Sequence, residues 1–244
     1  MARNNPVFRA DTFKSAYVGN AAERMTVAGA VNKSFVLILL TIFSATWIWR
    51  AQSPDVLVPA MLVGTIGGLV MALATSFRPR WAPVTAPLYA VLEGLALGAI
   101  SAFYTLSSPK LQGLPMQAVG LTFMVAIGML VAYRTGLLKA TETFKRVVIS
   151  ATIGIFFFMM FSLVLSMFGV RMSFLWDSSP LGIALNLFIA GIAALNLILD
   201  FDLIEQGAKM GAAKYMEWYG GFALLVTLIW LYLNILRLLA RMRR

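Results

Sequence analysis

The sequence predicts an all-α, polytopic membrane protein built as a bundle of seven transmembrane helices. Of its 244 residues, 60% are apolar and only 12% are charged, and the mean hydropathy is +0.83. A soluble domain is closer to half apolar and a quarter charged. Because water cannot solvate so much apolar surface, we expect lipid to surround most of this chain.

Seven apolar stretches, each bounded by charge, proline or glycine, account for most of the sequence. A helix needs about 20 residues to cross ~30 Å of hydrocarbon, and each stretch is close to that length. The predicted spans are 34–50, 56–77, 87–106, 116–134, 147–169, 180–204 and 218–240. The first is slightly short, but Lys33 and Arg50 can extend from its ends toward water.

The remaining segments are short and polar. We expect a cytoplasmic N-terminal tail over residues 1–33, a transmembrane domain over 34–240 and a basic end over 241–244. The tail lacks a long apolar core, so we do not interpret it as a cleaved signal peptide. We expect it to be flexible and to end in a short interfacial helix near Met25–Val31.

The distribution of lysine and arginine predicts the orientation. Thirteen of the 20 basic residues fall in loops on the side of the N-terminus, and seven fall on the other side. The positive-inside rule then places the N-terminus in the cytoplasm. The C-terminal cluster opposes this assignment, since seven spans carry Arg237, Arg241, Arg243 and Arg244 outward. A re-entrant last segment is the alternative.

The chain contains no cysteine and no histidine. Disulfides, iron–sulfur clusters, ordinary zinc sites and histidine-based catalytic triads are therefore excluded. Ten carboxylates remain as the strong anionic ligands, and hard cations prefer oxygen ligands of this kind. We expect ion handling rather than enzyme activity, with no bound cofactor.

The formal net charge of +10 raises the question of nucleic acid as a partner. In a membrane protein, such a charge more often reflects lysine and arginine facing anionic lipid headgroups. We therefore expect the lipid bilayer, and not nucleic acid, as the partner of the basic residues.

Small residues recur at every fourth position in two of the predicted spans. Gly64, Gly68 and Ala72 lie in the second span, and Gly94 and Gly98 lie in the third. This spacing lets helix backbones approach closely. We interpret both series as packing surfaces.

Carboxylates inside predicted spans are the strongest functional signal, because they are costly in lipid and usually face a bundle interior. Glu93 lies about six residues into the third span, and Asp200 lies late in the sixth. Burial disfavours the charged form of a carboxyl group, so such a site would respond to pH. For Glu93, a neutral and purely structural role is the alternative.

Helical geometry separates Asp200 from the acids that follow it. Successive residues are ~100° apart, so Asp200 and Asp202 point in nearly opposite directions. Asp200 shares its face with Asn196, which makes a small polar stripe and favours an interior position. Asp202 shares a face with Glu205, and a solvated helix end is an equal alternative for that pair.

The last span carries polar residues along one side, namely Thr227, Asn234, Arg237 and Arg241. An amide inside the membrane can bridge to a carboxylate on a facing helix. Asn234 is therefore a candidate partner for an acid on the sixth span.

Three strings resemble signatures of the transmembrane Bax inhibitor motif family. They are LDFDLIEQGA (Leu199–Ala208), LYLNILRLL (Leu231–Leu239) and LEGLALGAIS (Leu92–Ser101). The resemblance runs in order from the first span to the C-terminus. The chain resembles a prokaryotic branch of the family. It implies six helices around a central, C-terminal seventh helix, in the bacterial cytoplasmic membrane.

The resemblance also implies a function, since family members are described as pH-sensitive calcium leak channels gated by two aspartates on the last two helices. The first aspartate corresponds to Asp200, followed three residues on by Leu203, and Asp202 stands where the family often has an amide. Calcium would be the permeant ion, held transiently at Asp200. Arg78 is the candidate for an arginine that latches this aspartate.

The second family aspartate corresponds to Asn234, which is a departure. Two carboxylates can share a proton and split their titrations, whereas a carboxylate and an amide cannot. The pair could still coordinate a cation with one formal charge fewer. The separation between Asp200 and Asn234 is also long, but the two residues can still meet if the sixth helix continues past the membrane through Ala212.

We consider three alternative functions, and we rank the cation leak channel, with calcium as the expected ion, first. The second is a non-conducting regulator, because the resemblance includes relatives that restrain a membrane-bound protease. The third is a proton-coupled secondary transporter that uses Glu93 and Asp200, although the internal symmetry typical of transporters is missing.

Overall fold

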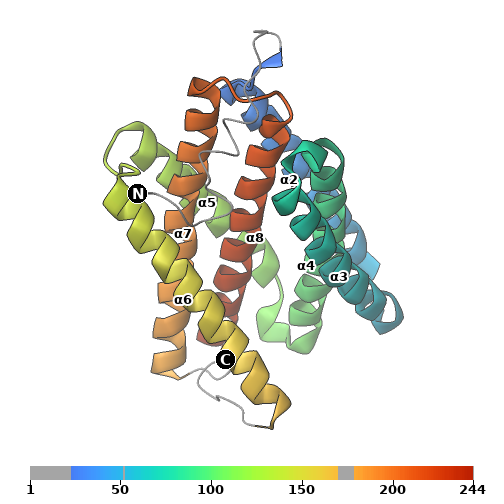
Figure 1. Cartoon of the computed structure of the whole chain (residues 1–244). Helices are drawn as coiled ribbons and strands as arrows, with labels where there is room; N and C mark the ends of the chain where they lie inside the picture. Colours follow the sequence, from blue (N-terminus) through green and yellow to red (C-terminus); the bar gives the residue numbers. More distant parts are fainter. Residues whose placement is uncertain (1–22, 52, 170–178, 244) are drawn as a thin grey trace. The chain divides into compact units, whose positions relative to one another are not determined.

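The computed structural model describes residues 23–51, 53–169 and 179–243. Seven helices within this part are long and apolar enough to cross a membrane. They are α2 (Val27–Ala51), α3 (Pro54–Phe77), α4 (Ala82–Ser107), α5 (Leu114–Arg134), α6 (Glu142–Met167), α7 (Pro180–Lys209) and α8 (Met216–Met242) (Figure 1). The predicted all-α, seven-helix, multi-pass fold is confirmed.

Two boundaries differ from the prediction. The short separate helix expected near Met25–Val31 is wrong, because α2 begins at Val27 and runs unbroken to Ala51. No proline or helix-ending glycine interrupts that stretch. At the other end, α7 extends past the predicted limit at 204 to Lys209. The helix does not continue through Ala212, because the chain turns at Gly211, which has a φ of 66°. Glycine adopts this left-handed conformation without strain.

The chain forms two compact units. Unit 1 comprises Met1–Phe103 and Asp202–Leu225, and unit 2 comprises Tyr104–Phe201 and Val226–Arg244. Both α7 and α8 therefore contribute one part to each unit. In α4 and α8, 56% of the most apolar window is buried, against 28% or less in α2, α3, α5 and α6. The last helix is thus among those least exposed to lipid.

Glycines bring α2, α3 and α4 close together in unit 1, as their spacing predicts. A Cβ atom at Gly64 of α3 would lie 2.5 Å from the Leu92 carbonyl oxygen of α4. A Cβ atom at Gly94 would lie 2.6 Å from the Thr41 carbonyl oxygen of α2. Because the backbones leave no room for a methyl group, these positions accept only glycine without a shift of the helices.

The segment before α2 pairs with the turn between α7 and α8, also in unit 1. The Met25 amide donates to the Ala212 carbonyl at 2.6 Å, and the Lys214 amide donates to the Glu23 carbonyl at 2.8 Å. An antiparallel bridge joins Arg24 to Ala213. These bonds attach the segment at the start of the first helix to the turn between α7 and α8.

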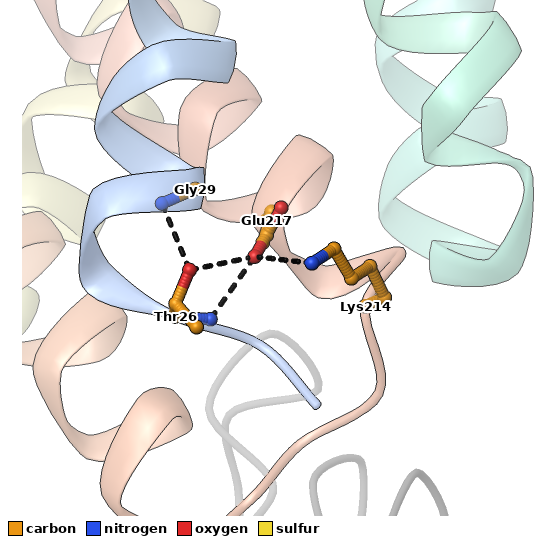
Figure 2. Close-up of polar contacts among 4 residues, drawn as sticks. All are labelled: Thr26, Gly29, Lys214 and Glu217. Carbon is orange, nitrogen blue, oxygen red and sulfur yellow. Dashed lines mark hydrogen bonds and ion pairs between the residues drawn. The ribbon is translucent and has the colours of Figure 1, made fainter. Parts of the chain in front are cut away.

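Glu217, the second residue of α8, completes this attachment (Figure 2). Its carboxylate is buried, with 1% of the residue exposed, and its Oε1 accepts from both the amide and the hydroxyl of Thr26 at 3.0 Å. The Thr26 hydroxyl in turn accepts from the Gly29 amide at 2.9 Å, which caps the N-terminus of α2. We call Thr26, Gly29, Lys214 and Glu217 the N-terminal clasp.

Candidate functional site

Asp200 lies in the second half of α7 and is buried in unit 2, with 8% of the residue exposed. The Thr227 hydroxyl of α8 donates a hydrogen bond to its carboxyl group. The Oδ2 atom has no hydrogen-bond partner within the described part of the chain, and Asp200 forms no ion pair there. One acceptor oxygen therefore stays available for a proton, a water molecule or a cation.

Asn234 is also buried in unit 2, with 3% exposed. Its Nδ2 donates to the Trp230 carbonyl, one turn back in α8, at 2.8 Å. Its backbone carbonyl accepts a hydrogen bond from the side-chain Nδ2 of Asn186 at 3.2 Å. The structure thus joins Asn234 to Asn186 of α7, whereas Asp200 is joined to Thr227, about two turns of α8 away from Asn234.

A third polar contact between α7 and α8 lies near the end of the chain. The Arg241 guanidinium is buried, with 8% of the residue exposed, and its NH1 donates to the Gly182 carbonyl at 2.6 Å. A buried arginine needs such acceptors, because its charge cannot be neutralised. Arg241 therefore marks the polar end of this helix pair.

The three contacts form one series, since they lie on one face of each helix. Thr227, Asn234 and Arg241 recur at every seventh position of α8, and a helix drifts only ~20° over seven residues. Asn186 and Asp200 are fourteen positions apart in α7. We call the pairs Asp200–Thr227, Asn186–Asn234 and Gly182–Arg241 the polar ladder.

Asn196, which sequence reasoning placed in a stripe with Asp200, has its amide bound elsewhere. Its Nδ2 donates to the Thr152 hydroxyl of α6 at 2.9 Å and to the Ile192 carbonyl at 2.8 Å. Asn196 thus joins α7 to α6, while Asp200, one turn later, is bound to α8.

Asp202 and Glu205 lie in the last two turns of α7, within unit 1. The Asp202 Oδ2 atom accepts from the Gln206 side chain at 2.6 Å, and Glu205 pairs with Lys209 one turn later. These are partners along one helix. Both side chains are half-buried.

Glu93 and Arg78 both lie in unit 1. The Glu93 side chain of α4 packs over Gly68 of α3, where an added Cβ would lie 2.9 Å from its Oε1. Glycine at that position makes room for the carboxyl group. The Arg78 guanidinium, just after α3, stacks on the Trp81 ring at 4.9 Å.

The described residues contain no group of three or more Asp, Glu, His or Cys side chains that could hold a metal ion. The polar ladder instead offers single oxygens in series, from one carboxyl group and two amides. Such a series suits a cation that passes, because conduction needs binding that is weak enough to release the ion.

Two buried polar residues, one in each unit, were not predicted from the sequence. Asn186 is buried with 2% exposed, and its only sequence signal is a spacing of fourteen residues before Asp200 in an otherwise apolar span. Glu217 was missed because it lies at the start of the last span, where an acid normally reaches water. Neither its burial nor its contact with Thr26, 191 residues earlier, can be read from local sequence.

A family model described as Bax inhibitor 1 like matches residues 5–244, which is nearly the whole chain. No curated protein and no solved structure matches this chain.

Proposed function

The chain belongs to the Bax inhibitor 1 like family, and from that premise we propose that it is a pH-sensitive cation leak channel with calcium as the permeant ion. Asp200 would be the gate and the pH sensor. The proposal needs no bound cofactor and no catalysed reaction.

One observation carries this proposal. Asp200 is a buried carboxyl group within a helix long and apolar enough to span the membrane, it contacts a second such helix through Thr227, and it retains an unpartnered oxygen. A carboxylate inside a membrane is expensive and usually marks an ion or proton pathway. Hard cations such as calcium take carboxylate and amide oxygens as ligands.

Protonation supplies the gating step. The ionised carboxylate accepts a charge-assisted hydrogen bond from Thr227, and such a bond is about twice as strong as a neutral one. Protonation replaces it with a weaker neutral contact, which loosens α7 from α8 at this point. The open state is therefore favoured as pH falls, and the closed state is favoured as pH rises.

Asn234 changes the form of the pH response. With one carboxyl group at the gate, a single titration is expected in place of the split titration of a carboxyl pair. Asn234 would contribute a neutral ligand further along α8. A cation on this path would therefore meet one formal charge rather than two.

Arg78 and Glu93 have subsidiary roles in the proposal. A latch at Arg78 requires its guanidinium to leave the Trp81 ring, on which it is stacked at 4.9 Å. Glu93, beside Gly68, would be a second acid within the membrane. We place the protein in the bacterial cytoplasmic membrane with its N-terminus in the cytoplasm.

Calcium flux into liposomes containing the purified protein tests the proposal. We expect flux from the parent, a changed flux from Asp200→Ala, and a second titration step in the pH profile of Asn234→Asp, which adds a carboxyl group. Asp55→Asn is the matched control, because Asp55 is an exposed acid in the first turn of α3. Absence of flux together with a stoichiometric co-purified protein would favour the non-conducting regulator instead.

A further inference from the structure

The second pair of the polar ladder, Asn186 and Asn234, is arranged unusually for two facing amides. Two asparagines across a helix interface can form a reciprocal pair in which every donor and acceptor is used. Here the Asn186 amide nitrogen donates to the Asn234 backbone carbonyl at 3.2 Å, and the Asn234 amide nitrogen donates to the Trp230 carbonyl at 2.8 Å. Neither side chain accepts from the other.

This arrangement leaves two oxygens without partners. The Oδ1 atoms of both asparagines are buried and have no hydrogen-bond partner in the described part of the chain. Their orientation is fixed, because turning either amide would set its oxygen against a backbone carbonyl. A buried polar atom without a partner is costly. Two such atoms on one pair of contacting residues indicate a site that is completed by something outside the chain.

The chemistry of that site is neutral and oxygen-only. Amide and carbonyl oxygens are ligands for hard cations, which also keep some of their water when few protein ligands are present. An anion is excluded, since the two unpartnered atoms are acceptors. From these contacts we propose that Asn186 and Asn234 form a second, uncharged coordination site for a partly hydrated cation, separate from Asp200. The proposal rests on the proposed function for its role in conduction, but not for its existence.

Nearby charge makes this site weak. The Arg241 guanidinium is held at the Gly182 carbonyl, one turn of α7 from Asn186 and two turns of α8 from Asn234. Its positive charge opposes a stably bound cation. A site that accepts an ion and then releases it is what conduction requires. The site therefore serves as a step on the path rather than as a store.

Two measurements test this inference on the full-length protein. The first is calcium flux in liposomes, and the second is thermal unfolding of the purified protein in detergent, with calcium chloride or choline chloride. The test variant is Asn186→Leu, which removes the oxygen but keeps a similar volume. The control is Asn32→Leu, because Asn32 is an exposed asparagine of α2 in unit 1.

We expect Asn186→Leu to reduce calcium flux about tenfold or more, as for the loss of a contact to a charged partner. We also expect it to abolish the stabilisation by calcium that the parent and Asn32→Leu show. Asn186→Asp, which restores an oxygen and adds charge, should retain or increase that stabilisation. This second variant separates loss of a ligand from a failure to fold.

The outcomes distinguish the two proposals. If the parent conducts through Asp200 while Asn186→Leu keeps parental flux and parental stabilisation by calcium, the second site is wrong and the channel stands. If the parent does not conduct, but calcium stabilises it and this effect is lost in Asn186→Leu, the channel is wrong and the site stands. Absence of both flux and stabilisation in the parent overturns both.

Discussion

Glu217 and Thr26 are 191 residues apart in sequence, yet the Oε1 atom of Glu217 lies 3.0 Å from both the amide nitrogen and the hydroxyl of Thr26. One carboxylate thereby satisfies an unpaired amide at the start of α2 and orients the hydroxyl that caps that helix (Figure 2). The Lys214 ammonium lies 3.9 Å from the same oxygen. The N-terminal clasp therefore ties the first helix to the turn between α7 and α8, within unit 1.

Replacing Glu217 should destabilise the protein strongly. Glu217→Ala removes a buried acceptor of two hydrogen bonds and leaves the Thr26 amide and hydroxyl without it, so we expect a loss of about 3 kcal/mol in the free energy of unfolding. Lys214→Ala should cost ~1 kcal/mol or less, because Lys214 is largely exposed and its ion pair is screened. Denaturant unfolding in detergent measures both. Equal losses for the two variants would contradict this account of the clasp.

The effect of replacing a glycine with alanine on the stability of the protein should depend on the space around that glycine. Gly98→Ala forces a methyl group against the Ala45 carbonyl of α2, and we expect a loss of about 1–3 kcal/mol, as for overpacking. Gly120 of α5 has nothing within 4 Å of an added Cβ, so Gly120→Ala should stabilise the helix by ~0.5–1 kcal/mol. Melting temperatures of the two variants should shift in opposite directions. A fall of similar size in both would show that close helix approach is not the cause.

Thr227→Val should favour the open gate at pH values where the parent is closed. The change removes the hydroxyl that donates to Asp200 while keeping the shape of the side chain. The loss of a hydrogen bond to a charged group is worth about 1.5–3 kcal/mol, so resting calcium flux should rise about tenfold. Thr227→Ser, which keeps the hydroxyl, is the control. Parental flux from Thr227→Val would mean that this bond does not hold the gate.

Arg241→Gln should increase cation flux without opening the gate. Glutamine keeps a donor for the Gly182 carbonyl but removes the positive charge that opposes a cation at the end of the polar ladder. We expect a rise of several-fold at every pH, and therefore an unchanged pH profile. A flux that falls, or a profile that changes shape, would assign Arg241 to gating or to folding rather than to the permeation path.

The sequence was sufficient for the fold because the bilayer imposes a length and a composition on every span. The seven apolar stretches correspond one to one to α2–α8, and the glycine series at Gly64 and Gly94 predicted close packing that the structure contains. The helix ends were less predictable. The end of α7 depends on Gly211 and on pairing with residues 23–25, and neither is a property of an apolar stretch.

The partners of the site residues could not be predicted, since they depend on the register between α7 and α8. Asp200 is buried, as its helical position predicted. Its contact with Thr227, and the contact of Asn234 with Asn186, require knowledge of how far one helix is shifted along the other. A shift of one turn would give each of these residues a different partner, and no composition rule fixes that shift.

The most direct test of the central claim is the pH profile of calcium flux in liposomes for the parent and for Asp200→Asn. Asparagine keeps the shape of the side chain but carries no titratable charge. We predict that parental flux rises as pH falls, and that Asp200→Asn has a raised flux that is nearly independent of pH. A variant that retains the parental pH profile would contradict the claim that Asp200 is the gate.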